Sequence, residues 1–135
     1  MDNISKKQRS INMSRIPSKD TQPELKLRKY LHSLGYRYRL NEKYLPGKPD
    51  IVFKTKKKVI FVHGCFWHRH QNCKFCTTPK TNISFWKEKF KKNVTRDEIV
   101  YNELSLLGWS YFISWECMIK KMEPIFLKEL TKFLK

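Results

Sequence analysis

The residues best suited to chemistry in this sequence lie in one short segment, from His63 to Cys76. It contains three of the four histidines and three of the four cysteines of the chain. Histidine nitrogen and cysteine sulfur are preferred zinc ligands, and four of them without an open position form a structural site. The spacing predicts such a site, with these ligands: Cys65, His70, Cys73 and, from a distant segment, Cys117. Cys76 also pairs with Cys73 as Cys-x-x-Cys, so either can be the ligand, and some of these thiols can be ordinary buried cysteines.

A second candidate site begins at Pro49-Asp50, directly before a short apolar run. A carboxylate held at the start of a strand by a rigid proline can present its oxygens to a hard cation such as Mg²⁺. If the strand after Asp50 pairs with the next strand, Val62 lies close to Asp50. The carbonyl oxygen of Val62 can then be a second hard ligand. Many nucleases have Glu-x-Lys where this chain has Val62-His63-Gly64. The alternative is that Asp50 only caps the strand.

His63 and His68 are the two histidines of the segment that the zinc site does not require. Imidazole titrates near neutral pH, so each can take a proton from water or give one to a leaving oxygen. Either can equally be a hydrogen-bonded packing residue, and the sequence does not divide the roles between them.

Large aromatic residues accompany these candidates: Phe66-Trp67 in a polar loop and Phe85-Trp86 at the start of a long helix. Near a basic surface such side chains can slide between base steps and kink a duplex. We predict this role for Phe66, Trp67 and Trp86, and core packing for Phe85. Phosphate contacts are expected from the basic residues that follow on the helix, which are Lys87, Lys89, Lys91, Lys92 and Arg96.

The composition favours a polyanionic partner. The 135 residues include 29 Lys+Arg against 12 Asp+Glu, for a formal net charge of +17. Such an excess of charge repels itself, and nucleic acid relieves the repulsion. The apolar run Val59–Val62 is far too short to cross a bilayer, and the first twenty residues lack the apolar core of a signal peptide. We therefore expect the protein to bind nucleic acid and not a membrane. We also expect it in a reducing cytoplasm, where cysteines do not form disulfides and can bind metal.

Helices and strands must position these residues, and the periodicity predicts where they lie. Thr21-Gln22-Pro23-Glu24 has the form of a capping box, and Gly35 fits the position after a helix end. Tyr36, Tyr38 and Leu40 alternate with arginines, as in a half-buried strand. The full prediction comprises a basic arm at residues 1–19, helices at 21–34, 85–107 and 124–134, and strands at 36–40, 51–53, 59–62 and 109–115. This order predicts an α/β fold, with a single domain at 20–135 whose mixed sheet is flanked by helices.

A series of short motifs runs in order through nearly the whole chain. The motifs are Arg9-Ser10-x-Asn12-Met13, Asp20-Thr21-x-x-Glu24, Tyr36-Arg37-Tyr38-Arg39, Leu45-Pro46-Gly47-x-Pro49-Asp50, Ile60-Phe61-Val62-His63-Gly64-Cys65-Phe66-Trp67-His68-x-His70, Phe85-Trp86, Lys89, Asn93, Arg96-Asp97, Leu107-Gly108-Trp109 and Trp115-Glu116-Cys117. In these motifs the chain resembles the very-short-patch mismatch repair (Vsr) endonuclease family, and the Gly-Cys-Phe-Trp-His block is highly specific. Cys76 departs from the family pattern.

The resemblance implies a PD-(D/E)xK nuclease-like core from which Glu-x-Lys has been lost. It implies Mg²⁺-dependent hydrolysis of the phosphodiester 5′ to the thymine of a T·G mismatch, which arises when 5-methylcytosine deaminates. The implied partners are double-stranded DNA with a T·G mismatch and, by function, a cytosine-5 DNA methyltransferase. We expect the protein to be a monomer.

The same resemblance implies roles for individual residues. Asp50 and the carbonyl of Val62 would hold catalytic Mg²⁺, with His63, His68 and Glu24 around the reacting phosphate. Structural Zn²⁺ would be held by Cys65, His70, Cys73 and Cys117, and DNA would be contacted by Phe66, Trp67, Trp86, Lys89, Asn93 and Arg96.

Two other functions stay open on the sequence alone. One is a restriction-type endonuclease that needs no mismatch, and the other is a zinc-bound DNA-binding module without catalysis. The combination of Asp50, His63 and His68 disfavours the non-catalytic module, because DNA binding alone requires none of these residues.

Overall fold

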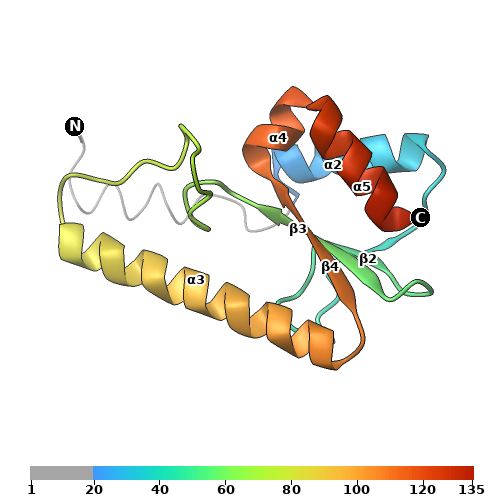
Figure 1. Ribbon diagram of the computed structural model, residues 1–135, viewed down its shortest axis with the longest axis horizontal. Helices are drawn as coiled ribbons and strands as arrows, with labels where there is room; N and C mark the ends of the chain where they lie inside the picture. Colours follow the sequence, from blue (N-terminus) through green and yellow to red (C-terminus); the bar gives the residue numbers. More distant parts are fainter. Residues whose placement is uncertain (1–19) are drawn as a thin grey trace.

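Four strands and four helices form the described part of the chain, residues 20–135 of the computed structural model (Figure 1). The strands are β1 (Arg39–Leu40), β2 (Ile51–Phe53), β3 (Lys58–His63) and β4 (Ser110–Trp115). The helices are α2 (Gln22–Ser33), α3 (Ile83–Leu106), α4 (Glu116–Lys121) and α5 (Pro124–Leu134). The predicted mixed α/β domain is confirmed, and the basic arm predicted at residues 1–19 lies outside the described residues.

The sheet has the strand order β1-β2-β3-β4 and combines two kinds of pairing. β1, β2 and β3 are antiparallel neighbours, whereas β4 runs parallel to β3 with His63 opposite Trp115. A parallel pair needs a crossover connection, and α3 provides it. The last residues of β3 and β4 and the start of β2 at Ile51 therefore meet at one edge of the sheet. This is the edge at which the candidate catalytic residues lie.

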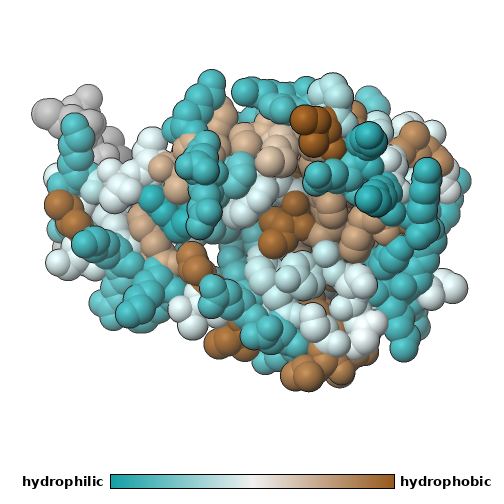
Figure 2. All heavy atoms as spheres, in the orientation of Figure 1, coloured by the Kyte–Doolittle hydropathy of each residue, from teal (hydrophilic) through white to brown (hydrophobic). Residues whose placement is uncertain are grey.

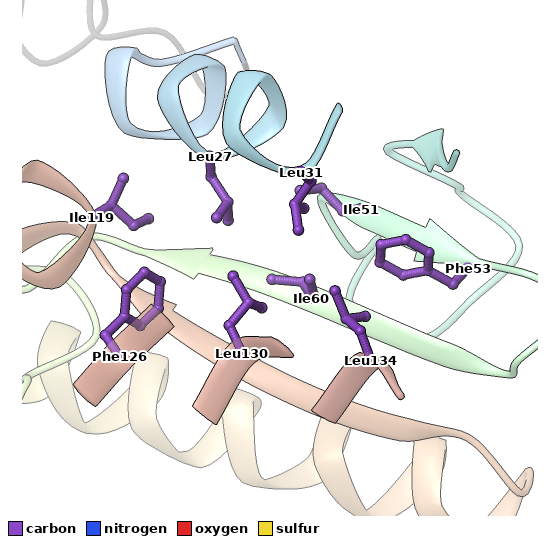
Figure 3. Packing of buried hydrophobic residues seen from close by; sticks show 9 residues of the cluster. All are labelled: Leu27, Leu31, Ile51, Phe53, Ile60, Ile119, Phe126, Leu130 and Leu134. Atoms are coloured by element: carbon purple, nitrogen blue, oxygen red, sulfur yellow. The ribbon is translucent and has the colours of Figure 1, made fainter. Parts of the chain in front are cut away.

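Alternate residues of the central strands pack against helices on opposite faces of the sheet. Ile51, Phe53 and Ile60 pack with residues of α2, α4 and α5 in the larger buried cluster (Figure 3). Its helical members are Leu27, Leu31, Ile119, Phe126, Leu130 and Leu134. Val52 and Val59 belong to a second buried cluster with Leu104 of α3. Because both faces are covered, β2 is a continuous apolar run and not an alternating one.

Helix α2 begins with one of the two side-chain-to-backbone hydrogen bonds of the predicted capping box. Thr21 is the N-cap, and its side-chain oxygen accepts a hydrogen bond from the backbone N–H of Glu24 at 3.4 Å. The carboxylate of Glu24 does not complete a capping box with Thr21; it accepts from the backbone N–H of Asp20 at 2.9 Å. Gly35 follows the helix at φ +90°, a backbone conformation that side chains other than glycine rarely adopt.

Two elements differ from the sequence prediction. The strand predicted at residues 36–40 is reduced to Arg39–Leu40, because the short β2 offers pairing partners to these two residues. Tyr36 and Tyr38 still face the core, where both rings contact Phe53 edge-on. The second difference is α4, a short helix that follows β4 directly and was not predicted.

The described helices leave a hydrophilic surface. No helix within residues 20–135 is long and apolar enough to cross a membrane. Hydrophilic side chains cover much of the face shown in Figure 2, interrupted by scattered hydrophobic residues. The lysines that follow Trp86 on this helix are exposed, so the positive charge of the chain is available to a polyanion.

Candidate active site and metal centre

A cleft of about 770 Å³ opens at the edge of the sheet where β2 begins and β3 ends. The start of α2, the loop before β2, the loop after β3 and one face of α3 line it. It brings together most of the residues predicted for catalysis and DNA contact: Glu24, Asp50, Val62, His63, Trp67, His68, Lys89, Asn93 and Arg96. Of the residues predicted to contact DNA, Phe66, Trp86, Lys87, Lys91 and Lys92 lie outside its lining.

Asp50 is anchored to the neighbouring strand. The backbone N–H of Val62 donates a hydrogen bond of 2.7 Å to its Oδ2 atom. Burial raises the pKa of Asp50 to about 6, and the nearby carboxylate of Glu24 adds to the rise, whereas Val62, Arg28 and His68 oppose it. Its negative charge is thus poorly compensated by the surrounding protein groups, and a bound cation would compensate it.

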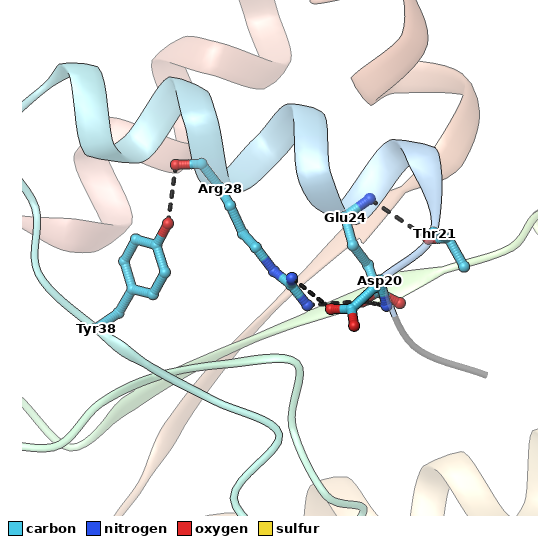
Figure 4. A network of polar contacts seen from close by, with 5 residues as sticks. All are labelled: Asp20, Thr21, Glu24, Arg28 and Tyr38. Atoms are coloured by element: carbon cyan, nitrogen blue, oxygen red, sulfur yellow. Dashed lines mark hydrogen bonds and ion pairs between the residues drawn. The ribbon is translucent and has the colours of Figure 1, made fainter. Parts of the chain in front are cut away.

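Glu24 is a buried carboxylate, 4% exposed, held by a network of polar contacts at the start of α2 (Figure 4). Arg28 donates to Glu24 Oε2 at 3.0 Å and to Asp20 Oδ1 at 2.7 Å. Tyr38 donates to the backbone carbonyl of Arg28 at 2.9 Å, which fixes the middle of the helix against the loop before β1. These contacts orient Glu24 at the wall of the cleft next to Asp50.

His63 and His68 stack face to face, with ring centroids 3.7 Å apart and planes 7° from parallel. Nδ1 of His68 lies 2.6 Å from Oδ2 of Asp97, whereas Nδ1 of His63 lies 3.4 Å from the Tyr101 hydroxyl. Burial lowers the pKa of His63 to about 3, the charge of His68 lowers it further, and Asp97 opposes both. His63 is therefore neutral near pH 7, and of the two histidines it is His68 that has a carboxylate partner.

One face of α3 carries several cleft residues at helical spacing. Asn93 donates from its side chain to the carbonyl of Trp67 at 3.1 Å, and Arg96 donates to Asn93 Oδ1 at 3.2 Å. Asp97 lies in one of the short motifs of the sequence, which predicted no role for it. Asn93, Asp97 and Tyr101 are four residues apart, and this spacing is the signal that places them on one helix face.

The predicted zinc ligands converge beside the cleft. The ligand atoms of Cys65, His70, Cys73 and Cys117 all lie within 4.8 Å of one another. A tetrahedral zinc site with Zn–S bonds of about 2.3 Å requires sulfur atoms about 3.8 Å apart. Cys65 follows the end of β3 and Cys117 follows the end of β4, so the parallel pairing of these strands brings the two cysteines together. The arrangement can hold a metal ion.

Cys76 does not belong to this group of four. It caps the turn of Cys73 instead, since its backbone N–H donates to the Cys73 carbonyl at 3.0 Å. Burial raises the pKa of the Cys65 thiol and of the Cys117 thiol. Burial also opposes ionisation of Cys73, but hydrogen bonds from the backbone of Phe75 and Cys76 and from the neighbouring cysteines lower its pKa. The contacts around Cys73 thus favour its thiolate, the form in which cysteine binds a metal.

The aromatic residues form one cluster next to the metal site. The ring centroid of Phe66 lies 5.0 Å from Trp67, 5.7 Å from Trp86 and 5.1 Å from Phe90. Trp86 is 6% exposed, and its indole N–H has no hydrogen-bond partner among the described residues. Phe85 is 61% exposed, so the prediction that it packs in the core is wrong. The helix turns Trp86 and Phe90, which are four residues apart, to one side and Phe85 to the other. Contact of Trp86 with DNA stays a prediction and requires this cluster to open.

Arg69 holds the loop of these aromatics against α3, a role that the sequence did not indicate. Its guanidinium lies 3.9 Å from the ring centroid of Phe90. It also donates to the carbonyl of Thr77 and to the hydroxyl of Thr78, both at 2.9 Å. Stacking on an aromatic face with several simultaneous hydrogen bonds is suited to arginine and not to lysine.

Comparisons with known proteins place the chain in a family. The sequence profile of the family described as DNA mismatch endonuclease Vsr matches residues 1–74. The chain is 41% identical to the DNA mismatch endonuclease Vsr of Escherichia coli over 126 aligned residues. The alignment covers 93% of this chain and 80% of that protein. The chain is also 41% identical to the type II nicking enzyme V.XorIIP of Xanthomonas oryzae pv. oryzae, over 90% of this chain and 88% of the relative. The identity to the type II nicking enzyme V.NmeAIP of Neisseria meningitidis is 46%, over 83% of this chain and 79% of the relative.

The matched profile includes Asp50 and the loop after β3 as far as residue 74, and the similarity to the relatives extends through α3 and β4. The resemblance seen in the short motifs is therefore confirmed over most of the chain. This protein belongs to the DNA mismatch endonuclease Vsr family.

Proposed function

We propose that this protein is a DNA endonuclease that nicks one strand of a duplex, 5′ to the thymine of a T·G mismatch, by Mg²⁺-dependent phosphodiester hydrolysis. The observation that carries the proposal is the cleft in which Asp50, Glu24 and His68 converge, in a chain of the Vsr family. T·G mismatches arise when 5-methylcytosine deaminates. We therefore expect the protein to accompany a cytosine-5 DNA methyltransferase, to start very-short-patch repair and to act as a monomer.

The sheet edge is proposed to be a PD-(D/E)xK nuclease-like core. Support comes from the antiparallel pairing of β2 and β3, which places Val62 beside Asp50. The Glu-x-Lys of such cores corresponds to Val62-His63-Gly64 in this chain. Other groups must therefore provide the second metal ligand and the positive charge of that motif.

Asp50 and the carbonyl of Val62 are the proposed Mg²⁺ ligands. The N–H of Val62 points at Asp50, and the N–H and C=O groups of one strand residue project to the same side. A buried carboxylate with a raised pKa and a backbone carbonyl directed to the same place form an oxygen donor set that fits a hard divalent cation. Bound there, Mg²⁺ would supply positive charge against the charge that develops on the phosphate.

His68 is proposed to take the proton of the attacking water. Because Nδ1 faces Asp97, Nε2 is the ring nitrogen left for the substrate. The carboxylate of Asp97 favours the tautomer with the proton on Nδ1 and stabilises the cation that forms when Nε2 is protonated. His63, which is neutral, stacks on the His68 ring and also lines the cleft, is proposed to hydrogen-bond the reacting phosphate. Glu24 is proposed to hold water near Asp50, because Arg28 fixes its carboxylate there.

Zinc is the proposed ion of the metal centre, with a structural role. Four protein ligands leave no position for substrate. The ligands Cys65 and His70 enclose the loop that carries Phe66, Trp67 and His68, so bound zinc would fix the catalytic and recognition residues together.

Mismatch recognition is assigned to the aromatic residues beside the cleft. Trp67 lines the cleft, and Phe66 and Trp86 pack behind it. Inserting rings between base pairs requires unstacking energy of a few kcal/mol per step, and a mismatched step needs less. Lys89, Asn93 and Arg96 are proposed to contact the DNA backbone and bases from α3.

The test is a nicking assay on an end-labelled duplex with a single T·G pair. The wild type should cut once, 5′ to the thymine, in Mg²⁺ and not in EDTA. Asp50→Asn should bind the duplex normally and cut at less than about 1% of the wild-type rate, since an amide lacks the charge that a hard metal site requires. Cutting by Asp50→Asn above a few per cent of that rate would remove Asp50 from the proposed metal site.

A further inference from the structure

Few cations line the catalytic cleft besides His68. They are Lys48, Lys89 and Arg96. Lys89 and Arg96 belong to α3, whereas Lys48 lies in the loop before β2, two residues before Asp50. Enzymes that transfer or hydrolyse phosphate place positive charge on its non-bridging oxygens, and the lysine of Glu-x-Lys is Gly64 in this chain.

We propose that Lys48 binds a non-bridging oxygen of the scissile phosphate and so takes over the charge of the missing lysine. The inference rests on the proposed function, because it assigns a substrate contact within the same cleft.

The backbone around Lys48 is fixed tightly. Gly47 has φ +74°, and a Cβ atom there would lie 2.4 Å from a methyl carbon of Val100 on α3. Pro49 is fully buried on the other side. Between these two anchors Lys48 itself has φ +49°, and its N–H donates to the carbonyl of Leu45 at 3.1 Å. A left-handed backbone is unfavourable for lysine and persists where the surroundings impose it. The turn therefore sets the point from which the Lys48 side chain projects.

The ammonium group of Lys48 is free to meet a substrate. Three of the carboxylates that line the cleft have cationic partners: Glu24 pairs with Arg28, Asp97 with His68, and Glu116 with Lys120. Lys48 is exposed and has no ion pair or hydrogen bond from its side chain to any residue between 20 and 135. Asp50 is too far for an ion pair, and Arg28 and His68 are the cations that lower its pKa. An unpaired lysine beside the metal-binding carboxylate is suited to bind phosphate as a point charge.

Lys57 offers a matched control. It is also an exposed lysine in a left-handed conformation, with φ +53°, and its N–H donates to the carbonyl of Lys54 at 3.2 Å in an equivalent turn. It lies in the turn between β2 and β3, at the opposite end of these strands from Asp50. Lys57→Gln therefore reproduces the local backbone strain and the loss of one charge, without removing charge from the cleft.

The experiment measures single-turnover nicking of a T·G duplex at saturating enzyme, with duplex affinity and thermal melting recorded for each variant. Lys48→Gln should slow nicking by about 10²-fold with affinity changed less than about threefold, because the contact strengthens as charge builds on the phosphate. Lys48→Arg should keep at least about a tenth of the wild-type rate, and Lys57→Gln should match the wild type.

A phosphorothioate at the scissile position supplies a second readout that does not depend on folding. On the diastereomer whose sulfur replaces the oxygen facing Lys48, the Lys48→Gln defect should shrink several-fold relative to the other diastereomer. An unchanged rate for Lys48→Gln, an equal defect in Lys57→Gln, or an equal defect on both diastereomers overturns the proposal. If the wild type itself does not nick T·G duplex, the proposed function fails, and this result is distinct from a failure at Lys48.

Discussion

Nδ1 of His68 lies 2.6 Å from Oδ2 of Asp97, and this contact joins the loop after β3 to the middle of α3. The same loop is tied on its other side to the four-residue metal centre through Cys65 and His70. His68 is therefore held between a metal centre and a carboxylate, in a stack with His63. The arrangement fixes the direction of one imidazole, as a proton acceptor in catalysis requires.

Asp97→Asn should slow the chemical step while leaving DNA affinity intact. An amide cannot stabilise protonated His68 and can favour the wrong tautomer, so we expect a loss of about 10²-fold or more in single-turnover rate. Glu98→Gln, which removes an exposed carboxylate from the next position of α3, is the matched control and should cut normally. Equal rates for the two variants would contradict the role of Asp97.

The metal centre should contain one zinc ion per chain. Cys65→Ser and Cys117→Ser should each lose the zinc and lower the melting temperature, because each removes a ligand that links the loop after β3 to the start of α4. Cys76→Ser should keep both the metal and the stability. Elemental analysis and thermal melting of these three purified variants and of Cys73→Ser test the prediction. Zinc retained in Cys73→Ser and lost in Cys76→Ser would reverse the ligand assignment.

Asp50 should make the metal-free protein less stable as pH rises. Its folded-state pKa of about 6 is raised above the unfolded value, so its favourable contribution is fully present below about pH 4 and is lost as pH rises through 6. Asp50→Asn carries no charge and should melt about 3–8 °C above the wild type at pH 8, with roughly half that difference at pH 5. Mg²⁺ at pH 8 should raise the melting temperature of the wild type and not that of the variant. A melting difference that does not depend on pH would contradict the burial of this charge.

Much of this site follows from residue spacing and strand pairing. Helix α5 and strand β2 lie where their apolar patterns predict them, and the four zinc-ligand candidates converge although Cys117 is distant in sequence. Strand pairing explains that success, because residues that follow neighbouring parallel strands meet at one edge of the sheet. The pairing also places Val62 against Asp50, as the sequence analysis expected.

Other features depend on three-dimensional context that a local pattern lacks. Phe85 and Trp86 are adjacent aromatics, and which one is buried depends on the side of α3 that packs against Phe66 in the loop after β3. Helix α4, Glu116–Lys121, is too short to show an amphipathic period, so the sequence predicts no element between the strand at 109–115 and the helix at 124–134. The role proposed for Asp97 depends on its contact with His68, which is 29 residues away in the sequence.

Trp67→Ala should weaken mismatch discrimination more than duplex binding. Removing the ring that lines the cleft removes the selective insertion at a weakly stacked step, while affinity for matched duplex is set by the positive charge of the chain. We expect nicking of T·G duplex to fall by about 10²-fold and matched-duplex affinity to change less than threefold. Trp86→Ala and Phe85→Ala in the same assay show which of these two aromatic residues contributes to mismatch discrimination. A ratio of T·G to T·A nicking that stays at the wild-type value in all three variants would contradict the wedge.

The most direct measurement of mismatch-dependent nicking compares two duplexes that differ by one base. The wild-type protein is given end-labelled T·G and T·A duplexes of identical flanking sequence, in Mg²⁺, under single-turnover conditions and in several flanking contexts. The account predicts one cut, 5′ to the thymine, in at least one T·G context, at a rate about 10²-fold or more above that of the matched T·A duplex. Equal cutting of both duplexes would indicate a restriction-type nuclease, and cutting of neither in any context would indicate a binding module; either result contradicts the account.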